Sequence, residues 1–188
     1  MARSARQRTR VKLLRTIRLD ASDTFVFDVP AEAGDWAVSG AFVFWNKDAA
    51  NLAGKARAAF RSGFLGVKSL GWSTLAQVVE VTEAERATLV DTLANQLIQH
   101  FEAPTIEAAK AAAEEEVAFA ESLCAIPQDS VIAVHRSFEN GAVRETFRVL
   151  RGKEGAKPTR AFSFIETEGD DEPSEQIDLI ALGEREHK

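Results

Sequence analysis

The sequence predicts an α+β fold, a two-layer arrangement in which three helices pack mainly on one face of an antiparallel or mixed sheet. Three observations predict it. Segments in which apolar and polar residues alternate lie near both ends of the region 11–150, and segments with helical spacing lie between them. The third is the pair Asn140-Gly141, which is typical of a type I′ hairpin turn because both turn positions need positive φ.

The first part of this region contains three expected strands. Residues 12–19 alternate between apolar and polar, and residues 24–28 form a second, short run. Residues 36–45, which end at Trp45, are apolar on both faces, as expected of a strand that is covered on both sides. Gly40 in the middle of this run indicates a bulge or a close approach of another part of the chain.

A helix is expected from about residue 48 to Ser62, with Gly63 as its C-terminal stop. Arg57 and Arg61 share the outer face of this helix because they are four residues apart. They could bind an anionic partner or make the helix face soluble. A fourth strand is expected at 72–81.

Two longer helices follow. The pattern Thr82-x-x-Glu85 is a capping box, which starts a helix that runs to Phe101. After Pro104, apolar residues recur at helical spacing from residue 106 to Cys124 and predict a buried stripe on a third helix.

The expected turn at Asn140-Gly141 fixes the register of strands 131–139 and 142–150. In that register Arg136 lies opposite Glu145 on the apolar side of the hairpin. Two charges on a side that faces the core must pair or reach water, because an isolated buried charge is costly. The structural interpretation is a paired salt bridge, and the functional one is a polar spot in a pocket that also involves Trp45.

One domain is expected, over residues 11–150. Residues 1–10 form a basic leader with four arginines, and residues 151–188 form an acidic tail; we expect the leader to be disordered and the tail largely so. The tail contains two apolar islands, 162–165 and 177–182, which either dock on the core or are inert. A translation start at Met1 and one at Val11 are both open.

Composition excludes several classes of function. The formal net charge of -6 argues against duplex nucleic acid as the main partner, because neutralised phosphates supply most of that affinity. No run of 18 or more apolar residues predicts a membrane span. The single cysteine excludes an internal disulfide framework. We therefore expect a cytoplasmic protein that contacts no membrane.

No pattern of catalytic or metal-binding residues is present. The three histidines lack metal-ligand spacing, and only a site shared by Glu116 and His100 across two helices is conceivable. Cys124 lies on a buried stripe near a helix C-terminus, where the helix dipole disfavours a thiolate. We expect a packed thiol, no catalytic residues, no metal and no cofactor.

Six strings of the sequence are long enough to be specific: 12–27, 36–45, 54–66, 71–74, 112–119 and 132–136. Together they resemble an uncharacterised bacterial family that is known as a domain of unknown function. The resemblance covers about residues 11–150. It supplies no catalytic residues, and it implies an association with formate-dehydrogenase maturation genes and a biotin/lipoate-ligase-like protein.

We therefore expect a non-enzymatic accessory or assembly protein that binds another protein, more than an enzyme. Its partner is expected to contact Arg57 and Arg61. The alternative is a small-molecule-binding domain or an unusual enzyme with a pocket near Arg136, Glu145 and Trp45. A closed pocket of about 300 Å³ or more favours the alternative. An exposed apolar patch rimmed by arginine favours the binding protein.

Overall fold

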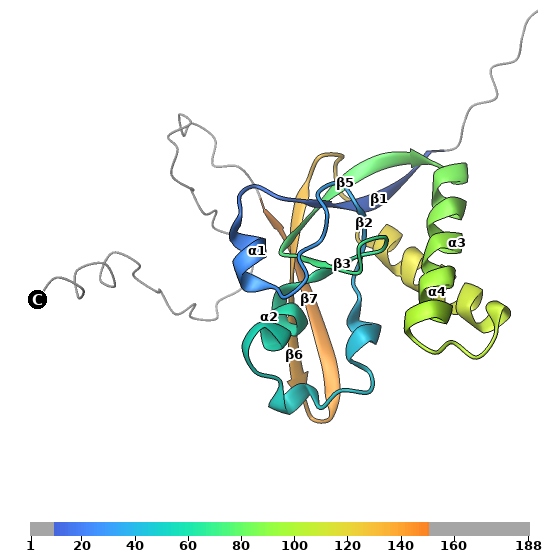
Figure 1. The fold of residues 1–188 in the computed structure, drawn as a ribbon. Coiled ribbons are helices and arrows are strands. Elements are labelled where there is room, and N and C mark those ends of the chain that lie inside the picture. The colour runs from blue at the N-terminus through green and yellow to red at the C-terminus, as the bar shows by residue number, and fades with distance from the viewer. Residues whose placement is uncertain (1–9, 151–188) are drawn as a thin grey trace, which may run out of the picture.

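The structure is a computed structural model that describes residues 10–150. Seven strands form one sheet in the order β4-β3-β2-β1-β5-β6-β7, and every pairing between neighbours is antiparallel (Figure 1). The strands are β1 (Arg10–Ile17), β2 (Trp36–Val38), β3 (Phe64–Gly66), β4 (Trp72–Ser73), β5 (Leu75–Thr82), β6 (Val131–Glu139) and β7 (Ala142–Leu150).

The helices are α1 (Ser22–Val26), α2 (Gly54–Ser62), α3 (Glu83–His100) and α4 (Ile106–Ser122), with short 3-10 turns at Ala41–Phe44 and Ala49–Asn51. The α+β class with an antiparallel sheet is therefore confirmed. Among the described helices, none is long and apolar enough to cross a membrane. The leader up to residue 9, the acidic tail and both apolar islands lie outside the described residues.

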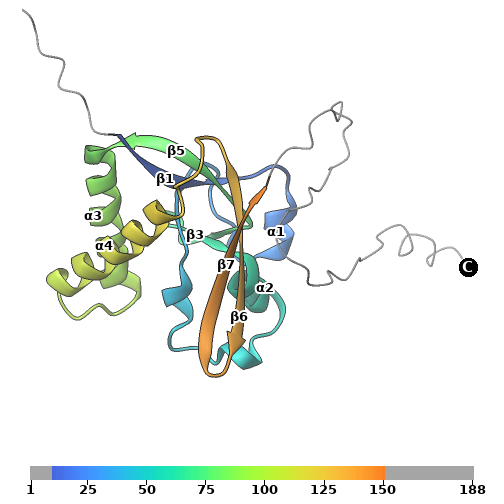
Figure 2. The same cartoon turned by 180° about the vertical axis from the view of Figure 1, so that it is seen from behind.

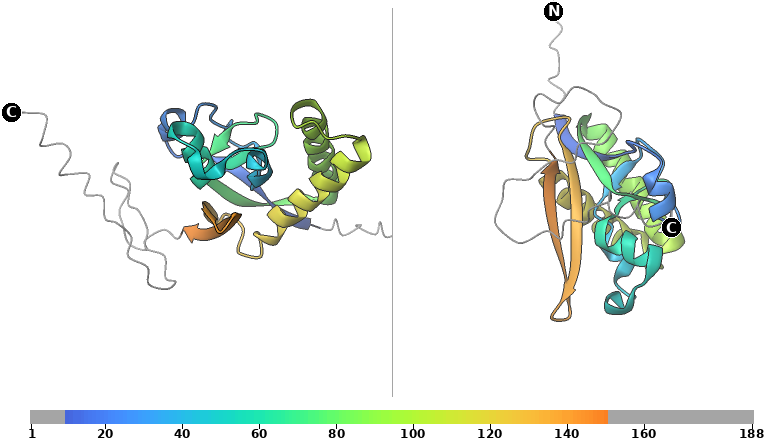
Figure 3. Two further views of the ribbon diagram at one scale, coloured as in Figure 1. Left: turned by 90° about the horizontal axis from the view of Figure 1, so that it is seen from below. Right: turned by 90° about the vertical axis from the view of Figure 1, so that its left-hand side faces the viewer.

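The core is centred on β1, the middle strand of the sheet. Leu13 and Leu14 point to opposite faces of this strand and are both fully buried, so β1 is covered on both sides. Helices α2 and α4 cover the face that carries Arg136 and Phe147, and they flank the β6–β7 hairpin in Figure 2. In the left view of Figure 3, α3 and α4 lie together at one end of the domain, and α1 and α2 lie at the other.

The expected strand at 24–28 is wrong, because most of this segment belongs to helix α1. Five residues are too few for periodicity to separate a strand from a helix. Local hydrogen bonds decide the conformation: Ser22 N donates to Asp20 Oδ1, and Thr24 Oγ1 donates to the carbonyl of Ala21. Phe25 consequently points outward and is 75% exposed.

The expected strand at 36–45 is only partly right, because β2 ends at Val38 and the chain then turns at Gly40. Gly40 has φ +74°, and a Cβ on it would lie 2.5 Å from the Cβ of Leu65. The expected close approach at Gly40 is thus confirmed. The turn carries the chain through Ala41–Phe44 to Trp45, which is not part of a strand and is 87% exposed.

Other boundaries move by a few residues. The first long helix begins at Gly54, after a separate turn, and the three-residue strand β3 that follows Gly63 was not expected. The expected strand 72–81 is divided between β4 and β5 at Thr74, whose N–H and hydroxyl both donate to the buried Asp23 carboxylate.

The strongest local signals are confirmed. The capping box is formed, because Glu85 N donates to Thr82 Oγ1 and Thr82 N donates to Glu85 Oε2. Asn140 and Gly141 have φ values of +52° and +81°, and Arg136 is paired with Glu145 across the hairpin. The register inferred from the turn is therefore the one observed.

Candidate functional site

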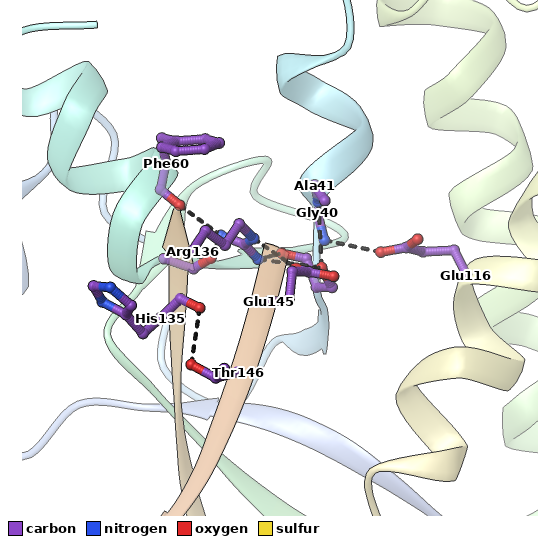
Figure 4. Close-up of polar contacts among 10 residues, drawn as sticks. Gly40, Ala41, Phe60, Glu116, His135, Arg136, Glu145 and Thr146 are labelled. Carbon is purple, nitrogen blue, oxygen red and sulfur yellow. Dashed lines mark hydrogen bonds and ion pairs between the residues drawn. The ribbon is translucent and has the colours of Figure 1, made fainter. Parts of the chain in front are cut away.

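The Arg136 side chain is the most buried charged group among the described residues, and the hairpin register places it over the ends of α2 and β2. Its Nε donates to Glu145 Oε1 at 2.6 Å, and its Nη1 donates to the carbonyls of Phe60 and Gly63 at 3.0 and 2.7 Å (Figure 4). Its Nη2 donates to the carbonyl of Ser39 and, at 3.2 Å, to Ser39 Oγ. One guanidinium thus joins β6, β7, α2 and the chain after β2.

This network supports the structural interpretation of the Arg136–Glu145 pair. Burial lowers the pKa of Arg136, while the charge of Glu145 and the hydrogen bond to it oppose that shift. Ser39 donates its hydroxyl proton to the same Glu145 oxygen. Among the described residues, no buried side-chain nitrogen or oxygen lacks a partner. Every nitrogen of this guanidinium is engaged by the protein itself, so no donor points toward a ligand.

Glu116 of α4 extends the polar network to the other side of Gly40. The backbone N–H of Gly40 donates to Glu116 Oε1 at 2.8 Å (Figure 4). Burial raises the pKa of Glu116, the Gly40 hydrogen bond lowers it, the charge of Glu145 raises it, and the charge of Arg136 lowers it. Sequence reasoning missed this contact, because it depends on how α4 packs against a turn that was expected to be a strand.

An aromatic groove of about 670 Å³ lies between Trp45 and the connection from α3 to α4. Phe42 and Phe101 form an edge-to-face pair in its wall, with ring centroids 5.2 Å apart. The residues that line the groove include Phe42, Trp45, Leu97, Phe101, Ala108 and Ala112, with His100 and Glu102 as polar members. We call this the Trp45 groove.

The structure brings together only two of the expected pocket residues. Arg136 and Glu145 pair as expected, but Trp45 lines the Trp45 groove, and neither charged residue belongs to that lining. Arg57 and Arg61 lie on the exposed face of α2, and no ion pair joins either to another described residue.

His135 on the neighbouring strand β6 has a lowered pKa. Partial burial is the main cause, and the charges of Arg61 and Arg148 lower the pKa further.

Cys124 is a packed thiol, as expected. It is 3% exposed, and its Sγ donates to the carbonyl of Ala120 at 3.3 Å. Burial, and then the charge of Glu121, raises the pKa of Cys124 to about 12, so the reactive thiolate is disfavoured. Within residues 10–150 there is also no cluster of three or more His, Cys, Asp or Glu residues that could hold a metal ion.

The sequence of α4 also indicates a contact surface beside its core stripe. Ala109, Ala113, Val117 and Ala120 form the buried stripe of the helix. Ala108 and Ala112 are exposed beside this stripe and line the Trp45 groove. Glu115 separates them from Phe119, whose ring packs edge-to-face on Phe147. Two small apolar residues exposed beside the core stripe indicate a second contact surface at this end of the helix.

A comparison with protein families shows the family to which the chain belongs. The model of a family of unknown function, DUF6505, matches residues 11–163. The chain belongs to this family. No curated protein and no solved structure matches it. The DUF6505 match begins at Val11, where the domain is expected to start, and continues past the end of β7 at Leu150. No activity is assigned to the DUF6505 family. A function for this chain therefore has to be argued from the chemistry of its surface.

Proposed function

We propose that this protein is a non-enzymatic accessory or assembly protein that binds another protein through the Trp45 groove. The observation that supports it is the indole of Trp45, which is 87% exposed beside a groove lined by two further aromatic rings. Exposed aromatic residues over an apolar surface are typical of interfaces, and tryptophan is among the residues enriched at their energetic centres.

The shape and charge of the groove indicate an amphipathic helix as the partner segment. Small residues at Ala108 and Ala112 let another helix approach α4 closely. Helix α4 carries five acids, of which Glu114 and Glu121 are paired with Arg86 and Glu116 accepts from Gly40. The acids left facing solvent near the groove are Glu107 and Glu115, and Glu102 adds a further acid in its lining. A segment with bulky apolar residues on one face and basic residues beside them therefore fits best.

The resemblance noted from the sequence suggests where to look for this partner. We propose proteins of formate-dehydrogenase maturation as the first ones to test, in a cytoplasmic setting that agrees with a single cysteine. Arg57 and Arg61 are a second predicted contact. In Figure 1, α2 lies on the opposite side of the domain from α3 and α4, so one short helix cannot occupy both surfaces.

Recovery of the partner from native cells by the tagged full-length protein tests the proposal. Trp45→Ala and Ala112→Glu should each remove the partner, whereas Phe138→Ala should retain it. Phe138 is a matched control because it is an aromatic residue, 41% exposed, that does not line the groove. If Arg57→Glu/Arg61→Glu removes the partner and Trp45→Ala does not, the partner uses α2 and the groove proposal fails.

A small-molecule ligand in the same groove is the second candidate. The groove volume of about 670 Å³ lies within the range of known small-molecule sites, roughly 300–1,000 Å³. The expected position of such a pocket changes, because Arg136 and Glu145 are occupied by each other and by backbone groups. Mass spectrometry of small molecules released from the purified protein distinguishes the two candidates. A compound that is lost with Trp45→Ala, in the absence of any captured protein, favours the ligand.

A further inference from the structure

Helix α1 and its flanks carry four exposed large apolar side chains, none of which lines the Trp45 groove. They are Leu19, Phe25, Val26 and Val29, which are 67%, 75%, 37% and 53% exposed. We call these four residues the α1 apolar surface. They belong to a segment of eleven residues, and Phe27 and Asp23 between them are buried and hold the segment on the domain. A concentration of exposed large side chains of this kind marks a contact surface.

We propose that residues 151–165 of the same chain fold back and cover the α1 apolar surface with Phe162, Phe164 and Ile165. This inference does not rest on the proposed function, because it concerns a different surface. The DUF6505 match supports it first. That match continues to residue 163, so the shared unit extends beyond β7 and includes the start of the first apolar island.

The position of Leu150 makes the contact reachable. Leu150 is paired with Val131, Val131 with Gln77, and Gln77 with Arg15, so three strand spacings of about 4.8 Å separate the end of β7 from β1. Helix α1 begins five residues after β1 ends at Ile17. Residues 151–161 can span about 36 Å when extended, which exceeds the roughly 14 Å across those strands plus a short path to α1.

The charge of the neighbouring residues favours the first apolar island, 162–165, over the second, 177–182, as the segment that covers α1. Residues 20–35 contain five acids and no Lys or Arg, and of these acids Asp20, Asp28 and Glu32 are exposed. Asp28 has only a 3.8 Å ion pair with Lys55. Residues 151–160 carry four Lys or Arg and one Glu, whereas residues 166–178 carry seven acids and no base. Arg15 and Arg18 donate to the Gly34 and Ala31 carbonyls of the same segment, so the charge of its exposed acids is partly offset. The basic stretch is attracted to Asp20, Asp28 and Glu32, whereas the acidic stretch before island 177–182 gains no such contact.

Hydrogen exchange of the full-length protein tests this inference. Replacement of Phe162, Phe164 and Ile165 together by serine should make the amides of residues 19–29 exchange at least about fivefold faster, because a covered segment becomes open. Replacement of Ile177, Leu179 and Ile180 by serine is the matched control and should leave that exchange unchanged. Amides of β1 and β5 report whether either variant has lost the core.

Three outcomes would overturn the inference. Exchange at 19–29 that is equally fast in the wild type and the first variant means that the tail does not cover α1. A faster rate caused by the second variant alone means that the wrong island was assigned. Protection that disappears when the wild-type protein is diluted means that a second copy of the chain covers the surface. Faster exchange in the first variant only, independent of concentration, supports the inference.

Discussion

Replacement of Arg136 by methionine should destabilise the fold strongly, because the guanidinium is the centre of a buried network. The variant removes the ion-pair partner of Glu145 and the donors to the carbonyls of Phe60, Gly63 and Ser39. A buried acceptor left without a partner costs about 1–3 kcal/mol, and breaking one side of a buried ion pair costs about 3–5 kcal/mol.

These two costs are not additive, because water can form hydrogen bonds with some of the groups that lose Arg136 as their partner. The Glu145 side chain keeps 18% exposure, whereas the Arg136 side chain has none. Water can therefore solvate the carboxylate in the variant, but it reaches the carbonyls around the former guanidinium less easily. We expect a total loss of about 3–4 kcal/mol in the free energy of unfolding, which is a large part of the stability of a typical domain.

Urea unfolding of the full-length protein measures this loss. Arg148→Met is a suitable control, because Arg148 lies on the exposed side of the same hairpin and its replacement should cost less than about 0.5 kcal/mol. The double variant Arg136→Met/Glu145→Met should be more stable than the sum of the two single losses implies, since no carboxylate is left unpaired. A loss below about 1 kcal/mol for Arg136→Met would refute the account of the network as a cross-link.

The remaining predictions concern the backbone and pH. Gly40→Ala should destabilise more than Gly34→Ala: both glycines have positive φ, but only at Gly40 does a Cβ meet another residue, 2.5 Å from Leu65 Cβ. Equal losses in thermal unfolding would contradict this. Gly141→Val should cost about 1–2 kcal/mol, because a β-branched residue is strained at φ +81° while its surroundings are open; a neutral effect would argue against the observed turn. Glu116→Gln should remove a pH dependence. The pKa of Glu116 is raised in the folded state, so its contribution is present below the ordinary value near 4.5 and is lost as pH rises through the higher folded value. Wild-type stability should therefore fall over that interval relative to the variant, and parallel pH profiles would contradict the burial of Glu116.

The parts of the fold that could be predicted are those fixed by local chemistry. The capping box at Thr82 and the hairpin turn at Asn140-Gly141 depend on hydrogen bonds and backbone angles within four residues, so the sequence is sufficient for both. The turn also determined that Arg136 faces Glu145. The strand expected at 24–28 is wrong and the one at 36–45 is right only as far as Val38, because short apolar runs suit strands, turns and buried helices alike.

The candidate site was less predictable, because it depends on contacts between distant segments. Trp45 was expected to belong to a strand near Arg136, but the turn at Gly40 carries it to the surface. The contact from Glu116 to Gly40 joins residues 76 positions apart, and no local pattern indicates it. Ala108 and Ala112, one turn apart beside the core stripe of α4, are a signal within the sequence that points toward the Trp45 groove.

The most direct test of the proposed function is a titration of the purified protein with the partner that it captures. Trp45→Ala should weaken the dissociation constant by at least about tenfold, since tryptophans at interface centres contribute more than about 1.4 kcal/mol. Acrylamide quenching of wild-type fluorescence should fall when the partner binds, because Trp45 is 87% exposed whereas Trp72 is 9% exposed. An unchanged dissociation constant for Trp45→Ala, together with unchanged quenching, would contradict the claim that the groove binds the partner.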